Sequence, residues 1–258
     1  MPATVAQARR IFDQLSTFGA FGAHAPQNRG GRKSCYITTV FATALLPWLE
    51  HGPASESLLD VGCGTGFFTA QARRHCRRVV GLDISMGMLA VARGVARAEG
   101  GELPLVCCDG VRLPLADRSF DRVVACESLH NLPDQLMPAM AAELGRLLRP
   151  GGQLYLLDQV SESPRWQVAE LELWGQKKRS VDELLGYFIE KGWVLHHASA
   201  VRQPRFPWIY LIWFGLLPRA LVPALARLEV RWNRRFCPLR TRRWHDALFV
   251  LGKRADGA

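Results

Sequence analysis

The sequence lacks the features by which several classes of protein are recognised. Its seven cysteines form no C-x-x-C pair, and their odd number in a 258-residue chain argues against a disulfide framework or a zinc site. The opening MPATVAQARRIFDQL carries charges that interrupt any apolar signal-peptide core, so export is not indicated. Neither an internal repeat nor a low-complexity tract is present. The length suits one α/β domain, which we expect to be cytoplasmic with reduced thiols.

Acidic residues are scarce at the C-terminal end. Residues 1–201 carry a net charge of +1, whereas residues 202–258 carry +9 of the total of +10. Such a basic block is either a solvated face or a contact surface for an anionic partner, a membrane or a nucleic acid.

Short apolar runs alternate with amphipathic stretches along most of the chain. Strands are predicted at 57–61, 79–83, 103–108, 121–126, 153–158, 193–201 and 247–252, and helices at 4–15, 35–50, 66–75, 86–99, 134–148 and 181–191. Pro133 is placed in the first turn of the helix at 134–148, and Ser180 and Glu183 form a capping box. Residues 16–34 are glycine-rich and are expected to form a loop. This alternation predicts a mostly parallel sheet with helices on both faces.

A glycine-rich turn follows the first predicted strand, in the segment LLDVGCGTGFF at 58–68. Glycines are needed where the backbone turns tightly and approaches a ligand closely. Asp60 lies two residues before Gly62, where it can meet the cationic amino group of an amino-acid ligand, and Gly64 completes the turn. A phosphate-binding turn would not favour that negative charge.

Two further acids end the next two predicted strands. Asp83 ends the second strand, where a carboxylate can accept both hydroxyls of a ribose. Asp109 ends the third strand, where it can accept a hydrogen bond from an adenine amino group, and Gly110 leaves room for the ring. The three acids together indicate a ligand with an adenosine half and an amino-acid half.

At these motifs the chain resembles the class I S-adenosylmethionine-dependent methyltransferases, in the small-molecule branch typified by ubiquinone and menaquinone biosynthesis enzymes. The matching segments are LLDVGCGTG, VVGLDISMGML, CCDGVRLPLADRSFDRVVACESLHNLPD and LGRLLRPGGQLYLLD. The resemblance implies a Rossmann-like seven-stranded sheet and an enzyme that uses S-adenosylmethionine. The residues that it implies as cofactor contacts are Asp60, Gly62, Gly64, Asp83, Ile84, Met88, Asp109, Gly110 and Cys126.

The resemblance also divides the chain into parts of one methyltransferase domain. We expect an N-terminal helical lid at 1–50, a cofactor-binding core at 51–201, an apolar and basic insertion at 202–245, and the last strand and tail at 246–258. His130 follows the fourth strand, where the family's substrate meets the methyl group, and is the candidate general base. The alternative is a histidine that only packs beside the cofactor. Glu127 is interpreted as structural, and no metal is implied.

The interpretation of substrate and partners rests on the insertion at 202–245. Residues 206–218 are free of charge but fall short of the roughly 20 residues that span a bilayer, and a basic stretch with interleaved aromatics follows them. Three alternatives remain: a buried cap or dimer contact, an interfacial helix on the anionic inner face of a membrane, and a nucleic-acid surface. We expect a small lipophilic acceptor, such as a quinone precursor, isoprenoid, pigment or lipid. An RNA methyltransferase and a non-catalytic cofactor-binding protein are the alternative functions.

Overall fold

The central sheet contains seven strands in the part of the chain that the computed structural model describes, residues 5–20, 31–50, 56–108, 111–164, 178–203 and 207–253. Their order is β3-β2-β1-β4-β5-β7-β6. The first five pair in parallel: β1 (Ser57–Val61), β2 (Arg78–Asp83), β3 (Leu105–Cys107), β4 (Phe120–Cys126) and β5 (Leu148–Val160). β7 (His245–Lys253) runs antiparallel between β5 and β6 (Trp193–Arg202), so the predicted mostly parallel sheet is confirmed.

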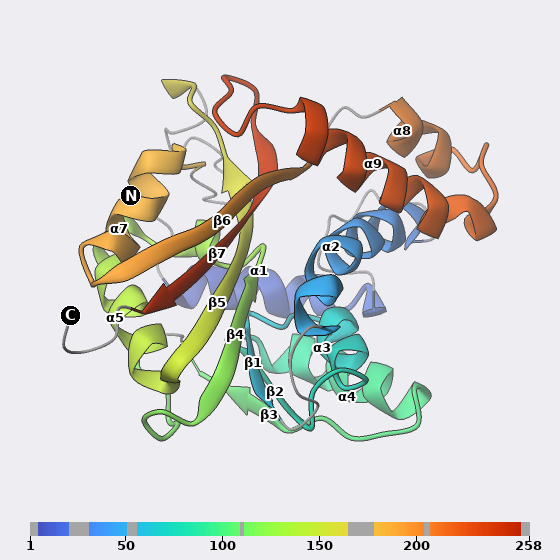
Figure 1. The fold of residues 1–258 in the computed structure, drawn as a ribbon. Helices are drawn as coiled ribbons and strands as arrows, with labels where there is room; N and C mark the ends of the chain where they lie inside the picture. Colours follow the sequence, from blue (N-terminus) through green and yellow to red (C-terminus); the bar gives the residue numbers. More distant parts are fainter. Residues whose placement is uncertain are drawn as a thin grey trace.

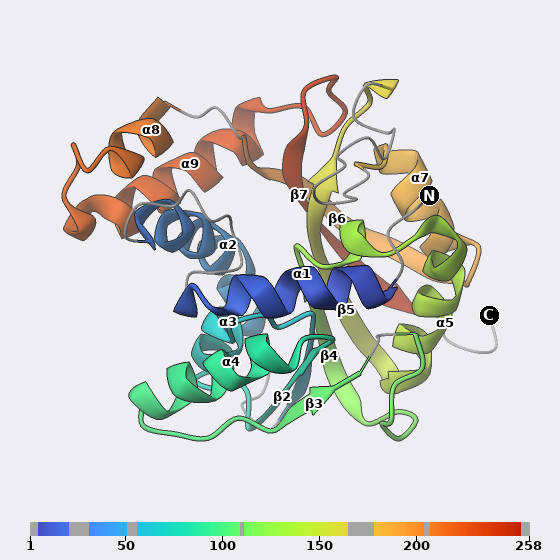
Figure 2. The same ribbon diagram turned by 180° about the vertical axis from the view of Figure 1, so that it is seen from behind.

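Helices cover both faces of this sheet (Figures 1 and 2). α5 (Met137–Leu147) and α7 (Val181–Ile189) lie on one face. α2 (Arg32–Glu50), α3 (Phe67–Ala72) and α9 (Val222–Phe236) lie on the other, and α8 (Pro207–Trp213) packs on α2. α1 (Val5–Ser16) crosses α4 (Met86–Ala98). Short 3₁₀ turns are formed by η3 (Leu129–Asn131), η4 (Asp134–Leu136) and η5 (Arg219–Leu221).

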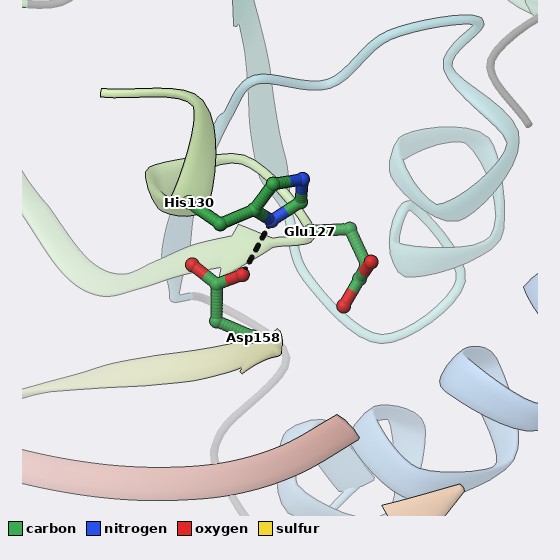
Figure 3. A group of neighbouring side chains, drawn as sticks. All are labelled: Glu127, His130 and Asp158. Carbon is green, nitrogen blue, oxygen red and sulfur yellow. Dashed lines mark hydrogen bonds and ion pairs between the residues drawn. The ribbon is translucent and has the colours of Figure 1, made fainter. Parts of the chain in front are cut away.

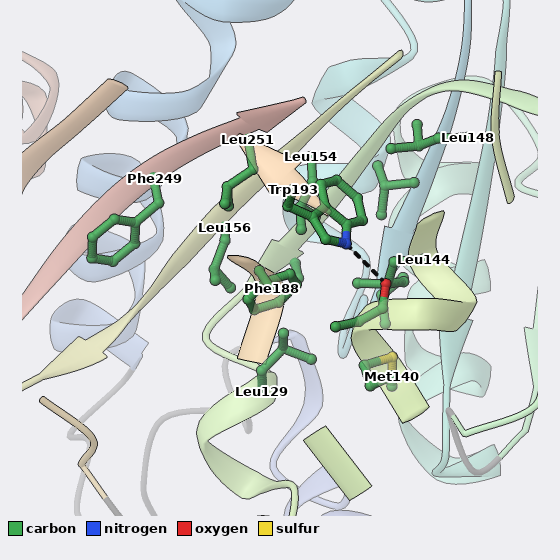
Figure 4. Packing of buried hydrophobic residues seen from close by; sticks show 14 of the residues in the cluster. Leu129, Met140, Leu144, Leu148, Leu154, Leu156, Phe188, Trp193, Phe249 and Leu251 are labelled. Carbon is green, nitrogen blue, oxygen red and sulfur yellow. Dashed lines mark hydrogen bonds between the residues drawn. The ribbon is translucent and has the colours of Figure 1, made fainter. Parts of the chain in front are cut away.

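Alternate residues of each strand enter two separate apolar clusters. Leu59 and Val61 of β1 pack with α5 and α7, whereas Leu58 packs with α2 and α9. A strand sends successive side chains to opposite faces, so a strand buried on both sides is apolar at every position. Figure 4 shows the first cluster, in which the buried Trp193 donates its indole N–H to the carbonyl of Ala141 over 3.1 Å.

Several element boundaries differ from the sequence prediction. β5 begins at Leu148, five residues early, because Leu148 pairs with Phe120 before the register shifts. α5 begins at Met137, since residues 134–136 form a 3₁₀ turn, and a different proline, Pro138, lies in its first turn. The capping box exists, with Ser180 Oγ accepting from the Glu183 N–H at 3.1 Å. Residues 32–34, expected in a loop, begin α2.

A candidate cofactor and acceptor site

One cavity of about 1040 Å³ lies at the carboxyl ends of β1, β2 and β4. The predicted site residues that line it are Asp60, Gly62, Gly64, Asp83, Ile84, Met88, Cys126 and His130. Asp109 and Gly110 lie outside the described residues, although the preceding Cys108 lines the cavity. The topology explains this convergence, because parallel strands bring their following loops to the same edge of a sheet.

The turn after β1 requires its glycines for two different reasons. Gly62 has φ of 74°, and a Cβ built there would lie 2.4 Å from the Cβ of Ser128, in the loop after β4. Gly64 has φ of 54°, and a Cβ there would meet nothing within 4 Å. Since Gly64 lines the cavity, that open space is part of the cavity. Gly62 therefore lets two loops touch, whereas Gly64 leaves the backbone accessible from the cavity.

Asp60 is a buried acid at the end of β1. Its Oδ2 accepts a hydrogen bond from the Thr69 hydroxyl at 2.6 Å. Burial raises the pKa of Asp60 to about 7; the Thr69 hydroxyl opposes this effect and the Asp83 charge adds to it. Such a carboxyl is matched to a cationic ligand group, which would stabilise its ionised form.

Asp83 is hydrogen-bonded to the glycine turn. Its Oδ2 accepts from the N–H of Gly64 at 2.8 Å, and its Oδ1 accepts from the N–H of Ser85 at 2.9 Å. Each carboxylate oxygen has a second lone-pair direction, so both can also accept from ribose hydroxyls. Burial raises the pKa of Asp83, and the backbone N–H groups that it accepts from oppose this.

The N-terminal helix α1 packs beside the cavity and is hydrogen-bonded to the start of α4. Asp13 of α1 accepts from the Ser85 hydroxyl at 2.6 Å and from the N–H of Gly87 at 3.2 Å, so α1 is fastened to the start of α4. Ala8 and Phe12 of the same helix line the cavity. The open face at Gly64 and the two buried acids fit a ligand with an amino-acid half and a ribose.

His130 lies on η3 and points toward β5. Its Nδ1 lies 2.5 Å from Oδ1 of Asp158, and the two side chains are 4% and 1% exposed (Figure 3). Asp158 Oδ1 also accepts from the N–H of Gln159 at 2.8 Å. A carboxylate held in this way fixes the proton of a neutral imidazole on Nδ1 and leaves Nε2 as the proton acceptor.

Glu127 lies beside this pair in an uncommon backbone conformation. Its φ is 52°, a left-handed value that a residue with a Cβ seldom adopts. Its Oε2 accepts from the Gln159 side-chain amide at 2.6 Å, and burial together with the charges of Asp246 and Asp158 raises its pKa well above the usual range.

Some residues of the site were not singled out in the sequence. Asp158, which contacts His130 but does not line the cavity, was noted only as the last residue of a strand; the available signal was an acid at the end of the fifth strand, like the acids that end the first three. Lys33, Lys178 and Trp244 line the cavity. No local motif marks them, because they come from three distant segments.

The insertion is both a cap and an exposed surface. Ile209 and Ile212 of α8 and Val222, Ala226 and Val230 of α9 are buried on α2. Tyr36 of α2 donates its hydroxyl to Glu229 of α9 and accepts from the Trp208 indole at 2.5 Å. The outer side of α9 remains exposed. No described helix is long and apolar enough to cross a membrane.

The sheet order, the glycine turn and the acids at successive strand ends together define a Rossmann-like methyltransferase that uses S-adenosylmethionine. Residues 58–152 match the model of a family described as a methyltransferase domain. The methyltransferase GfsG of Streptomyces halstedii is 33% identical over 71% of this chain and 70% of its own length.

Other relatives match over shorter stretches. A demethylmenaquinone methyltransferase of Corynebacterium kroppenstedtii is 36% identical over 46% of this chain, and 2-phytyl-1,4-naphtoquinone methyltransferase of Synechocystis is 30% identical over 57%. The chain spans 48% and 57% of these two proteins. The crystal structure of geranyl diphosphate C-methyltransferase from Streptomyces coelicolor, at 15% identity, has a TM-score of 0.67 over 98% of this chain and 99% of that one, which shows the same fold.

The chain belongs to the class I S-adenosylmethionine-dependent methyltransferases, in the branch that methylates small molecules. The resemblance drawn from the motifs is confirmed, and so is the cofactor.

Proposed function

We propose that this enzyme methylates a lipophilic small molecule and that His130 removes the proton of the acceptor. The contact that carries the proposal is the 2.5 Å approach of His130 Nδ1 to Asp158, because His130 itself lines the cavity. S-Adenosylmethionine, when bound, supplies an activated methyl group. Asp60, Gly64 and Asp83 would hold it, Ile84, Met88 and Cys126 would line its site, and Asp109 with Gly110 would meet the adenine.

The chain's own part in the reaction is positioning and proton removal. Nε2 of His130 accepts the acceptor's proton, and Asp158 stabilises the imidazolium that forms. Both side chains are buried, so the pair keeps one orientation and competes little with water. Methyl transfer from a sulfonium demands no further acid or nucleophile from the protein, since its leaving group is already activated.

An apolar lining supports a lipophilic acceptor. The apolar and aromatic side chains of the cavity lining include Ile37, Phe41, Leu129, Met140 and Trp244. The names of two relatives state that they act on quinone precursors, and those molecules share this character.

Labelled methyl transfer tests this proposal. The enzyme is incubated with S-adenosylmethionine labelled in its methyl group and with a lipid extract, and the labelled product is identified by mass spectrometry. We expect label in an apolar compound with the wild type, and at least about 100-fold less with His130→Asn. Label found only in an aqueous extract, or in RNA, would contradict the lipophilic acceptor.

The exposed side of α9 supports binding at an anionic membrane surface. Leu228, Trp232 and Phe236 are 50%, 52% and 62% exposed and lie four residues apart, so they form one stripe. Arg227, Arg231 and Arg235 form a parallel exposed row one residue earlier along the helix. Apolar side chains in the headgroup boundary beside arginines at lipid phosphate are the pattern of an interfacial helix.

Vesicle sedimentation tests this surface. We expect binding to phosphatidylglycerol vesicles that salt weakens, and little binding to phosphatidylcholine. Replacing Leu228, Trp232 and Phe236 by serine should abolish it. Ile189→Ser on α7, also an exposed apolar position, is the control. RNA binding that is lost when the three arginines become glutamine, without vesicle binding, would favour the nucleic-acid alternative.

A further inference from the structure

His130 and Asp158, the two members of the buried pair, come from different elements (Figure 3). His130 lies on the 3₁₀ turn η3, and Asp158 lies near the end of β5. A 3₁₀ turn has poorer hydrogen-bond geometry than an α-helix, so a single short turn depends on contacts from outside to hold its position. The 2.5 Å approach of Nδ1 to Oδ1 therefore depends on how the turn is held against the strand. Arg179 contacts both.

The main chain of Arg179 is attached to β5. Its carbonyl accepts from the N–H of Ser161 at 3.0 Å, and a parallel bridge pairs Arg179 with Val160, two residues after Asp158. On its other side, Arg179 directly precedes Ser180, the N-cap of α7. The Arg179 side chain therefore starts from a main chain that is fixed to the strand of Asp158.

The side chain of Arg179 holds the turn that carries His130. Its Nη1 donates to the carbonyl of Leu129 at 3.1 Å, and its Nη2 donates to the carbonyl of Leu132 at 2.6 Å. These two carbonyls flank His130 in the chain. Nε and Nη2 also donate to Oδ1 of Asp134, at 2.9 Å and 2.8 Å. Because a guanidinium is planar and its donor directions are fixed, this set of contacts leaves it little freedom to rotate.

The Arg179 side chain is buried but lies behind the cavity. It is 2% exposed, and its guanidinium lies 5.8 Å from the centre of the Tyr187 ring of α7. Arg179 is not among the described residues that line the cavity. Its donors are used within the protein, so its removal would leave a carboxylate and two carbonyl groups without them.

We propose that Arg179 is a positioning residue that sets the approach of His130 to Asp158. This inference rests on the proposed function, in which His130 removes the acceptor's proton, and it adds the group that keeps the pair assembled. Without the guanidinium the turn is no longer held to β5, so the imidazole can move away from Asp158 and carry its proton on either nitrogen. A proton on Nε2 removes the atom that accepts the proton of the acceptor.

The tautomer of His130 tests this inference without any acceptor. Nitrogen-15 NMR of histidine-labelled protein bound to S-adenosylhomocysteine distinguishes a proton on Nδ1 from one on Nε2, and His130→Asn identifies the signal among the seven histidines. We expect the proton on Nδ1 in the wild type and a mixture of both tautomers in Arg179→Gln. Asp134→Ala removes the carboxylate that orients the guanidinium and should give a smaller change. Because Asp134 is 38% exposed, this variant should fold even if Arg179→Gln does not.

Labelled methyl transfer into the lipid extract measures the consequence for the reaction. Arg179→Gln should slow transfer at least about tenfold, because a misplaced base is costly, and should leave S-adenosylhomocysteine affinity unchanged. Arg179→Lys keeps the charge but lacks the planar set of donors, so it should restore only part of the rate. Arg122→Gln is the control. It removes another buried arginine, which donates to the Trp48 carbonyl at 2.9 Å, and should lower the melting temperature without changing the tautomer.

The outcomes separate this inference from the proposed function. If the proton stays on Nδ1 in both Arg179→Gln and Asp134→Ala, the positioning role is overturned, even where His130→Asn abolishes transfer. A tautomer change of equal size in Arg122→Gln would also overturn it, because the change would then reflect a general loss of stability. A wild-type His130 whose Nε2 carries a proton would contradict the proposed base, and the inference with it.

Discussion

The cofactor half and the cap half of this enzyme are built in different ways. The cofactor half is contiguous in sequence: β1, β2 and β4, with the loops that follow them, supply Asp60, Asp83 and His130. The cap half joins distant segments, as in the hydrogen bond between Tyr36 and Glu229, which are 193 residues apart. Local motifs can therefore specify the first half, whereas only the completed fold specifies the second.

The largest effect should come from His130, where the two halves meet. His130→Asn should lower the turnover number by at least about 100-fold and leave S-adenosylhomocysteine affinity unchanged, because the imidazole serves the acceptor and not the cofactor. Asp158→Asn should lower turnover as well, since the proton on Nδ1 loses its carboxylate partner. Calorimetry and labelled methyl transfer measure the two quantities. A His130 variant with nearly normal turnover would restore the alternative that this residue only packs.

Removing a buried contact in the cap half should lower the free energy of unfolding rather than the turnover number. Glu229→Ala should reduce the free energy of unfolding by about 2 kcal/mol, because it leaves the buried Tyr36 hydroxyl without its hydrogen-bond acceptor. Arg227→Gln, at an exposed position of the same helix, should change it by less than about 0.5 kcal/mol. Urea titration measures both. Equal effects would mean that the buried contact contributes nothing.

Glu229 also predicts a pH dependence of the free energy of unfolding. Burial raises the pKa of Glu229 from 4.5 to about 7, so the folded state binds a proton that the unfolded state has released. The contribution of Glu229 is full below pH 4.5 and is lost as pH rises through about 7. Glu229→Gln should remove this component, so the decline in stability between these pH values should be shallower than in the wild type. An unchanged slope would assign the decline to other acids.

Asp60 should couple cofactor binding to protons. Because its pKa is about 7 in the free protein, a cationic amino group that stabilises the carboxylate should release a proton when it binds. Affinity for S-adenosylhomocysteine should therefore fall below pH 7, and calorimetry in buffers of different ionisation enthalpy should detect the release. Asp60→Asn should abolish the release and weaken binding about tenfold. If proton release persists in this variant, the released proton comes from a group other than Asp60.

The smallest expected effect is that of replacing Gly64, and Gly100 provides a matched control. Gly64→Ala and Gly100→Ala share a positive φ and open space around the added methyl group, so each should cost about 1 kcal/mol of stability. Gly64 alone of the two lines the cavity, so only its variant should also bind S-adenosylhomocysteine more weakly. Thermal melting with and without this ligand distinguishes them.

The sequence predicted the strands well because each combines an apolar run with a turn signal. The glycines and the acids Asp60 and Asp83 could be found for the same reason, since their roles follow from short spacings at strand ends. The pairing of His130 with Asp158 could not, because two separate strand ends had to be brought together. Trp208 lies in the segment for which a buried cap, an interfacial helix and a nucleic-acid surface were the alternatives. It donates to Tyr36 and packs inward, whereas the exposed stripe lies on α9.

The position of β7 has a consequence for how the protein is made. β6 pairs with β7 and not with β5, so it has no neighbour in the sheet until residues 245–253 have left the ribosome. During synthesis β5 presents an open edge, which is prone to pairing with other chains. The cofactor half can form first around contacts close in sequence. The part of the cavity lined by Arg202 and Trp244 forms only when the last strand inserts, so the nascent enzyme should form the part of the cavity around Asp60 and Asp83 first.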